Sequence, residues 1–153
     1  KGLTLLLYKD ARCDMNLLDE SGYKWKREHQ LINNKLFCTV SIYDTEIKEW
    51  VSRQDVGVES NTEATKGEAS DSFKRACFNW GIGRELYSAP FIWISGDKYS
   101  GYINKNGKPA TYDKFSVTNI KYDENTREIT GIAVKNEKTG KGVFLWQKQV
   151  SQS

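Results

Sequence analysis

Apolar and polar residues alternate along residues 29–43, and this period of two predicts β-strands rather than a helix. The apolar positions of the alternation are Leu36, Cys38, Val40 and Ile42. Asn33-Asn34 interrupts the block with residues that favour a tight turn, so we expect one strand on either side of it. A loop near residues 44–46 leads to a third strand over about 49–58. The pattern therefore predicts a three-stranded antiparallel meander.

A helical stripe of apolar residues follows the meander over residues 62–80. Asn61 or Thr62 can cap its start, and Glu63 lies in the first turn, where the helix dipole favours a negative charge. Gly81 is a suitable helix stop. The apolar positions of the stripe are Ala69, Phe73, Ala76, Cys77 and Trp80. We expect this long helix to pack on one face of the meander.

Helical spacing also marks residues 5–20, with Gly22 as a plausible stop. The apolar positions with this spacing are Tyr8, Ala11, Met15 and Leu18. An opening helix is therefore predicted over residues 5–20, ahead of the meander.

The last third of the chain returns to a β pattern. FIWI (91–94) is predicted as a short strand, and a loop rich in glycine and lysine over residues 97–109 follows it. Three alternating segments come next, with turns at Glu124-Asn125 and at 138–141; they read FSVTNIKYD, REITGIAVKN and GVFLWQKQ. The predicted fold class is α+β: an antiparallel β-meander packed on a long helix, a β-β-β-α core, with a second C-terminal β-meander.

A length of 153 residues suggests one domain with its own core. The net charge of +3 conceals a segregation, because residues 44–71 sum to −5 and residues 72–153 to +6. Ordinary surface charge explains this pattern. A basic groove beside an acidic region explains it too, and such a groove would serve a polyanion or a contact between subunits.

Cysteine and histidine are too few for a zinc site. The three cysteines, Cys13, Cys38 and Cys77, form no C-x-x-C pair, and His29 is the one histidine. Isolated thiols fit a reducing compartment. No signal peptide is visible, and the apolar run 3–8 is too short to span a membrane. Because residue 1 is Lys, we expect the chain to be a trimmed or ordered part of something longer.

Motifs of catalysis are missing from the sequence, which has no G-x-x-x-x-G-K-[ST], no H-E-x-x-H and no nucleophile elbow. We therefore predict no enzyme activity, no catalytic residues, no cofactor and no metal. The carboxylates of residues 55–71 offer one alternative, a metal-dependent nuclease. A solvated acidic face or a subunit contact is the other interpretation of these residues, which are Asp55, Glu59, Glu63, Glu68 and Asp71.

Two clusters of cations could hold phosphates. Lys74 and Arg75 are adjacent on the predicted helix and point about 100° apart. Residues 23–27, YKWKR, interleave two aromatic rings with three cations. A solvated pair with Arg75 bridged to Asp71 at i,i+4 explains the first cluster equally well. An amphipathic strand edge with Trp25 buried explains the second.

A longer run adds a resemblance to these clusters. DVGVESNTEATKGEASDSFKRACFNWGIGRELYSAPFIW resembles the Sak-type single-strand annealing proteins of bacteriophages, which belong to the superfamily of the eukaryotic annealing protein Rad-fifty-two. The preceding LLLYKDARCDMNLLDE and YKWKREHQLINNKLFCTVSIYD are similar to the opening helix and hairpins of the same family. The resemblance covers residues 3–94 well and the C-terminal meander only loosely.

The resemblance implies ATP-independent binding of single-stranded DNA and annealing of complementary strands in phage recombination. It implies a homo-oligomeric ring or arc with a basic groove, in the cytoplasm of the bacterial host. A phage exonuclease or a single-strand-binding protein is a candidate partner, and no membrane is expected. The chain would be a single annealing domain, 1–153, with a family core in residues 1–94, a DNA-binding helix over 62–80 and a β-extension in residues 95–153.

The same resemblance assigns the DNA-binding residues. Lys74 and Arg75 match the family's phosphate-binding pair, and the supporting positions are Arg12, Lys66 and Tyr23. Eukaryotic members carry a further arginine one helical turn after the pair, where this chain has Phe78. Either Lys26 or Arg84 is expected to compensate. The alternatives are the nuclease described above and a protein-interaction module of a phage replication complex.

Overall fold

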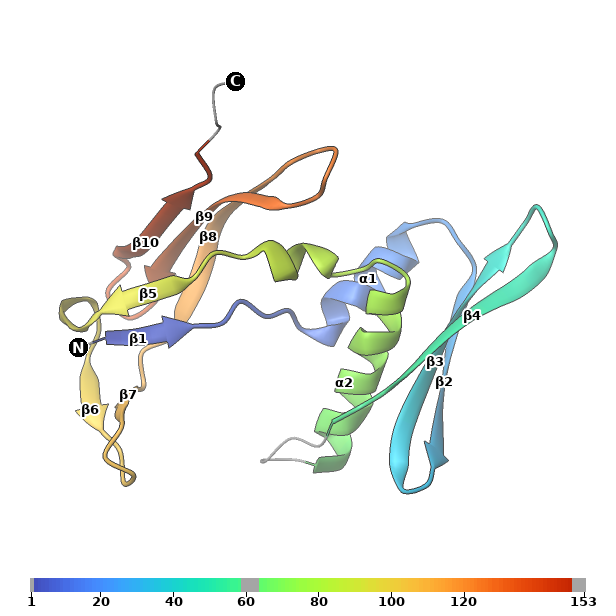
Figure 1. Ribbon diagram of the computed structural model, residues 1–153, viewed down its shortest axis with the longest axis horizontal. Helices are drawn as coiled ribbons and strands as arrows, with labels where there is room; N and C mark the ends of the chain where they lie inside the picture. The colour runs from blue at the N-terminus through green and yellow to red at the C-terminus, as the bar shows by residue number, and fades with distance from the viewer. Residues whose placement is uncertain (1, 59–63, 150–153) are drawn as a thin grey trace. The chain divides into compact units, whose positions relative to one another are not determined.

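The computed structural model describes residues 2–58 and 64–149, apart from the side chains of residues 64–66 (Figure 1). Its backbone contacts form two compact units. The helical unit is Lys9–Arg84, and the β unit is Lys1–Tyr8 with Glu85–Ser153. The described residues combine α-helices with strands that pair antiparallel, so the predicted α+β class is confirmed. Whether residues 1–153 act as one annealing domain stays a prediction.

The helical unit contains the predicted meander. Its strands are β2 (Trp25–Ile32), β3 (Lys35–Asp44) and β4 (Glu49–Val56), and they pair antiparallel in the order β2-β3-β4. Asn33 and Asn34 have φ angles of 50° and 59°, as a two-residue turn between twisted strands requires. The meander is therefore confirmed, with β4 ending two residues before the predicted limit.

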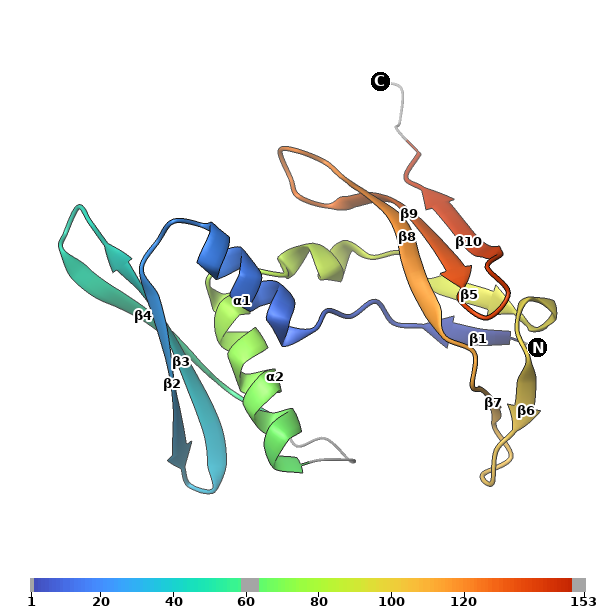
Figure 2. The same cartoon turned by 180° about the vertical axis from the view of Figure 1, so that it is seen from behind.

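Helix α2 (Ala64–Asn79) lies against the sheet, and α1 (Ala11–Glu20) lies on the same side (Figures 1 and 2). Phe73 of α2 is fully buried against Val40 of β3. The core of the helical unit consists of Ala11, Leu18, Cys38, Val40, Phe73, Ala76 and Cys77. The predicted apolar stripe is thus the packed face of the helix.

The C-terminal end of the predicted long helix lies within the described residues, and its predicted N-terminal caps lie outside them. Gly81 has a φ of 92°, which glycine adopts without strain, so the predicted stop is confirmed. The predicted caps, Asn61 or Thr62, and the first-turn residue Glu63 lie outside the described residues. Gly57 lies just before the undescribed segment, where a Cβ would collide with the backbone carbonyl of Glu68 in α2. Glycine is therefore required for this close approach of chain to helix.

The prediction of a helix from residue 5 is wrong. Helix α1 begins only at Ala11, because Asp10 caps it by accepting a hydrogen bond from the Arg12 amide. The residues before it form β1 (Gly2–Leu5), which pairs antiparallel with β5 (Ile92–Ser95). Tyr8, taken from its spacing as part of the apolar face, is 84% exposed. A pairing partner about 90 residues away leaves no local periodicity to reveal it.

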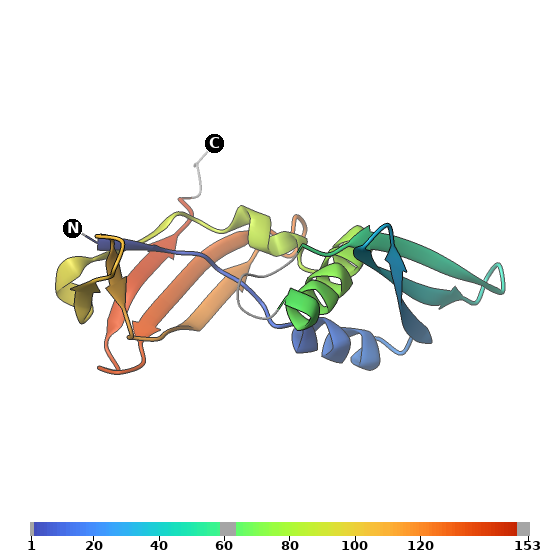
Figure 3. The same ribbon diagram turned by 90° about the horizontal axis from the view of Figure 1, so that it is seen from below.

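The β unit contains the second predicted meander, β8 (Phe115–Tyr122), β9 (Ile129–Asn136) and β10 (Gly142–Gln147). Figure 3 shows these strands side by side, with β9 in the centre of the order β10-β9-β8. Ile132 and Val134 of β9 pack against Ile92 and Ile94 of β5. The ribbon of β1 and β5 therefore supplies the other half of this core.

The predicted loop over 97–109 is wrong in part, because it contains regular structure. A short 3₁₀ helix, η2 (Gly96–Lys98), is followed by β6 (Gly101–Ile103), which pairs with β7 (Pro109–Thr111). Strands of three residues are too short for an alternation to be visible in the sequence. A second 3₁₀ helix, η1 (Arg84–Ser88), lies between α2 and β5. Within the described residues, no helix has the length and apolar character needed to cross a bilayer.

Candidate nucleic-acid interface

The carboxylate of Asp10, at the start of α1, is influenced by two predicted phosphate ligands, Arg12 and Lys74. The Arg12 guanidinium donates to Asp10 through Nε at 3.1 Å and through Nη2 at 3.0 Å. Hydrogen bonds from the side chain and backbone of Arg12, with smaller effects from the charges of Arg12 and Lys74, lower the pKa of Asp10 to about 2. The charge of Lys74 on α2 therefore acts on the same carboxylate that binds Arg12.

Arg75 points elsewhere. Its Nε donates to the Asp71 carboxylate at 2.8 Å, so the ion pair predicted at i,i+4 is confirmed. The same carboxylate accepts a hydrogen bond from the Val58 amide at 2.9 Å. About half of the Arg75 side chain is exposed, whereas Lys74 is partly buried. Arg75 is therefore held near the residues that follow β4, by the carboxylate that also binds the Val58 amide.

Two further predicted ligands are Lys66 and Tyr23. The side chain of Lys66, in the first turn of α2, lies outside the described residues. Tyr23 lies between α1 and β2 and is 64% exposed. It is open to solvent on the chain segment that joins α1 to the sheet. A contact of Lys66 or of Tyr23 with nucleic acid remains a prediction.

The YKWKR cluster is split between the two faces of the sheet. Trp25 faces α2, where its ring packs beside that of Phe73. Side chains alternate along a strand, so Lys26 faces the opposite, uncovered side. Its ammonium lies 4.4 Å from the centre of the Trp50 ring. Lys26 is thus on the far side of the sheet from Lys74, and the structure does not bring these two candidates together.

Arg84 has a structural task at the end of α2. Its Nε donates to the Phe78 carbonyl at 3.0 Å and its Nη2 to the Asn79 carbonyl at 3.3 Å. These are carbonyls of the last helical turn, which have no partner within the helix. A cation at this end also complements the helix dipole. Arg84 therefore acts as a C-terminal cap, and much of its donor capacity is already used.

Sequence reasoning did not single out two arginines on the helix-facing side of the sheet: Arg27 was counted only within the YKWKR cluster, and Arg53 was missed. The Arg27 guanidinium lies 5.1 Å from the centre of the Phe73 ring, and the Arg53 guanidinium lies 4.8 Å from that of Trp80. Both side chains are exposed at the rim of the packed face. The period of two in β2 and β4 could have placed them there, because Arg27 follows Trp25 by two residues and Arg53 pairs with Val40.

Two of the carboxylates proposed for a nuclease, Glu68 and Asp55, accept hydrogen bonds within the fold. Glu68 accepts from the Leu36 amide at 2.8 Å, and Asp55 accepts from the Val56 amide at 2.8 Å and from Asn79 Nδ2 at 3.2 Å. Glu59 and Glu63 lie outside the described residues. Among the residues that are described, no three His, Cys, Asp or Glu side chains are grouped to hold a metal ion. These carboxylates join the helix to the strands.

Buried thiols complete the chemistry of the helical unit. Cys38 and Cys77 are fully buried in its core. Burial raises the pKa of Cys38 to about 11 and that of Cys77 to about 12, so both remain protonated thiols at neutral pH. His29 Nε2 lies 3.1 Å from the Ala69 carbonyl and links β2 to α2. These groups have packing roles.

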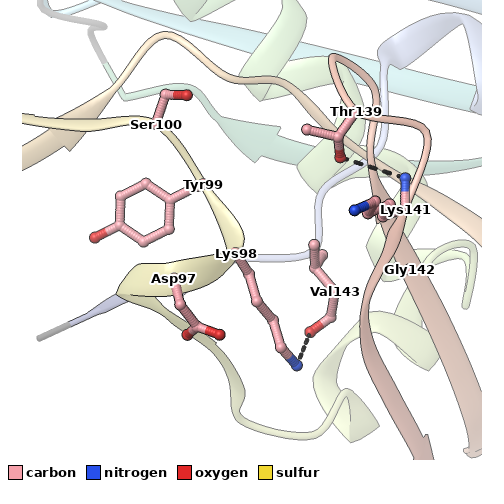
Figure 4. Close-up of a pocket in the computed structure, with 8 residues that line it drawn as sticks. All are labelled: Asp97, Lys98, Tyr99, Ser100, Thr139, Lys141, Gly142 and Val143. Carbon is pink, nitrogen blue, oxygen red and sulfur yellow. Dashed lines mark hydrogen bonds between the residues drawn. The ribbon is translucent and has the colours of Figure 1, made fainter.

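A pocket of about 280 Å³ opens in the β unit (Figure 4). Lys98 lines it, but its ammonium donates to the Val143 carbonyl at 3.1 Å. The Asp97 carboxylate adds a negative charge to the same wall. The other lining residues are Tyr99, Ser100, Thr139, Lys141 and Gly142. A cation tied to a carbonyl beside a carboxylate does not make a site for an anion.

Comparison with known proteins gives one named similarity. The chain is 34% identical over 96 residues to the single-stranded DNA-binding protein DdrA of Deinococcus radiodurans. The matched region covers 61% of this chain and 45% of DdrA, so the chain spans less than half the length of that relative. No protein-family model matches the chain, and no solved structure matches it. The similarity is therefore to a single-stranded DNA-binding protein, and the finer resemblance to phage annealing proteins stays a prediction.

Proposed function

We propose that this protein binds single-stranded DNA through the sugar-phosphate backbone, and that it does so on the surface shared by α1 and α2. The observation that carries the proposal is the 34% identity to a single-stranded DNA-binding protein over 96 residues. The cations around Asp10 supply the chemistry, because DNA affinity that does not depend on sequence comes mainly from phosphate neutralisation.

The arrangement around Asp10 favours a phosphate contact. Asp10 holds the Arg12 guanidinium through Nε and Nη2, and the Arg12 side chain is 82% exposed. A guanidinium fixed on one edge loses less freedom when its remaining donors bind a phosphate. Lys74 adds a second positive charge that acts on the same carboxylate. Arg75, the next residue of α2, is proposed to contact a neighbouring phosphate of the same strand.

We further propose that the bound strands are annealed without ATP, as part of phage recombination in the cytoplasm of a bacterial host. Annealing forms no covalent bond, which agrees with a sequence that has no P-loop and no nucleophile elbow. Free thiols at Cys13, Cys38 and Cys77 fit a reducing compartment. A phage exonuclease or single-strand-binding protein is the proposed partner.

A ring or arc of identical subunits is the proposed assembly. In the described part of the helical unit, β2 and β4 each pair only with β3, so the outer edge of each strand is open. Seven of the eight residues of β2 are exposed, which is the state of an edge that a neighbouring subunit can cover. The predicted contact of Glu59 and Glu63 with a neighbour lies outside the described residues.

The first test measures binding and annealing separately. Lys74→Ala with Arg75→Ala should weaken binding of a labelled oligothymidylate by at least about tenfold in low salt. The slope of log affinity against log salt should become shallower by about 1.4, since each lost contact to single-stranded DNA contributes about 0.7. The control of equal charge is Lys35→Ala with Lys121→Ala, which removes two exposed lysines that lie in strands β3 and β8 rather than in α1 or α2.

Annealing is followed by energy transfer between two complementary labelled strands, without ATP or added metal. Acceleration over the protein-free rate, lost in the Lys74 and Arg75 variant, is the expected result. Binding without acceleration would leave a single-strand binder and contradict annealing. Normal affinity in the double variant would refute the site, and strand cleavage with added magnesium would restore the nuclease alternative.

A further inference from the structure

Two tyrosines form a stacked pair on the β6–β7 hairpin of the β unit. Tyr102 lies opposite Ala110 in the ladder, and Tyr112 is two residues beyond Ala110, so the rings meet on a diagonal. Their centroids are 4.7 Å apart and their planes differ by 15°. Tyr102 is 40% exposed and Tyr112 is 85% exposed. The stack therefore ends on the surface, with the Tyr112 ring open to solvent.

Hydrogen bonds at the tip hold the hairpin that carries the stack. Hydrogen bonding with the Tyr112 phenol is the main reason that the pKa of Tyr102 is raised, so the Tyr102 ring is neutral at physiological pH. Asn104 Oδ1 accepts from the amides of Asn106 at 2.9 Å and Lys108 at 3.0 Å, which fixes the tip of the hairpin. Another flat ring can stack on an exposed pair held in this way with a small loss of conformational entropy.

The charge around the stack is positive. Residues 101–112 contain Lys105 and Lys108, both exposed, and no acidic residue. Asp113, which follows, is buried and accepts from the Ser100 amide and from Asn136 Nδ2, both at 2.8 Å. Lys138 lies 3.5 Å from its carboxylate. The negative charge nearest in sequence to the stack is thus paired, and the hairpin carries two exposed cations at its tip in addition to the open aromatic ring.

We propose that the β6–β7 hairpin is a second contact for single-stranded DNA, in which an unpaired base continues the stack on Tyr112 and flanking phosphates lie near Lys105 and Lys108. This inference rests on the proposed function and adds base stacking to the phosphate contacts of the helical unit. Aromatic rings with nearby cations are the elements by which single strands are held without sequence preference.

The Phe91 and Trp93 rings provide a contrast within the same unit. They are also stacked and exposed, but their centroids are 6.4 Å apart. Residues 85–96 include Glu85 and no lysine or arginine, so this segment itself supplies no cation for a phosphate. The positive charge beside the tyrosine pair is what distinguishes the hairpin as a site for a polyanion.

The test compares strands with and without bases, using the full chain. Tyr102→Ala with Tyr112→Ala should weaken binding of oligothymidylate at least about fivefold, the low end for one stacked base. Binding of an abasic oligomer with the same number of phosphates should not change. Tyr112→Phe keeps the ring and should bind normally. Tyr122→Ala, a tyrosine of β8 that is 45% exposed, is the matched control.

Three outcomes would overturn the inference. The first is normal oligothymidylate binding by the double variant while Lys74→Ala with Arg75→Ala abolishes it, which would leave the proposed function standing. The second is an equal loss on the thymidylate and abasic strands, which would mean that the tyrosines only support the fold; thermal unfolding of each variant would show this independently. The third is an absence of DNA binding by the unaltered protein, in which case the proposed function fails as well.

The lysines are tested by salt dependence. Lys105→Ala with Lys108→Ala should make the slope of log affinity against log salt shallower by about 1.4 on both the thymidylate and the abasic strand. An unchanged slope would remove the phosphate part of the proposal. Together with the tyrosine variants, this measurement separates the base contact from the backbone contact.

Discussion

The two units of this protein use their aromatic rings in different ways. In the helical unit, cations lie over ring faces: Lys26 over Trp50, Arg27 over Phe73 and Arg53 over Trp80. Its ring pairs, Trp25 with Phe73 and Tyr43 with Trp50, meet tilted or edge-on rather than stacked. In the β unit, rings lie against rings: Phe91 on Trp93 and Tyr102 on Tyr112. A face already covered by a cation is closed to a nucleobase, whereas the outer ring of a stacked pair is open to one.

This difference suggests a division of tasks. Arg27 and Arg53 are held over rings on the side of the sheet that faces α2, where the proposed phosphate contacts lie. The stacked rings of the β unit present flat apolar faces, and of the two stacked pairs described there, the one on the hairpin of β6 and β7 has lysines in the same segment. One unit is therefore suited to the backbone of a strand and the other to its bases. The following predictions test this comparison, from the largest expected effect to the smallest.

Truncation of one phenylalanine in each unit should have very different consequences. Phe73→Ala empties a fully buried site under the Arg27 guanidinium and should lower the free energy of unfolding by about 3–5 kcal/mol. Phe91→Ala removes a ring that is 73% exposed and should change it by no more than about 0.5 kcal/mol. Urea denaturation measures both. A large loss for Phe91 would mean that the stacked rings of the β unit are part of a core.

Glu68→Ala should lower the free energy of unfolding by about 1.5–3 kcal/mol, because the Leu36 amide loses an ionised acceptor. Glu68→Gln keeps a carbonyl oxygen in place and should cost less. Chemical denaturation is the measurement, with magnesium-dependent strand cleavage assayed in parallel. If Glu68→Ala were as stable as the unaltered protein, the acidic segment would not have the structural role assigned to it, and its chemistry would need another explanation.

Lys26→Ala should cost about 0.5–1 kcal/mol of stability, the usual size of an exposed cation–π contact. Its effect on DNA affinity should be smaller than that of Lys74→Ala, since Lys26 lies on the side of the sheet away from α2. Binding isotherms for the two single variants in the same low-salt buffer decide this. Equal losses would extend the DNA surface to the uncovered face of the meander and weaken the division between units.

The smallest effect concerns Asp10. Its pKa is about 2, below the ordinary 3.8, so its contribution to stability is present above pH 3.8 and is lost as the pH falls towards 2. Arg12→Ala removes the main cause and should move the titration midpoint of Asp10 upward, towards 3.8. Lys74→Ala should move it in the same direction by less. Carboxyl NMR shifts followed against pH give both values, and an unmoved midpoint would separate Arg12 from this surface.

Much of the helical unit could be predicted because its signals are local. The alternation around Leu36–Ile42 and the turn at Asn33-Asn34 correspond to β2 and β3 as predicted. The stripe through Phe73 and Cys77 is the packed face of α2. Each pattern is set by residues within a few positions of one another, and the repeat length of each element reports directly which face is buried.

The candidate site was predicted less completely, since residue type does not specify direction. Arg84 was expected to meet DNA, but it caps the carbonyls of α2. Lys26 was grouped with its neighbours in sequence, but the pleat of β2 turns it away from Trp25. Arg27 and Arg53 come from β2 and β4, and they flank Val40 on one face only when the sheet forms. Such groupings depend on contacts between distant segments.

The sequence by itself therefore determined which segments are strands or helices wherever the period was sustained, and which cations were available to bind a polyanion. The tertiary structure decided that Gly2–Leu5 is a strand, because its partner β5 is about 90 residues away. It also decided that Tyr102 and Tyr112 are stacked, since two strands of three residues show no alternation of their own. Local conformational preferences act over a few residues, whereas pairing and stacking gain their free energy only after distant segments meet.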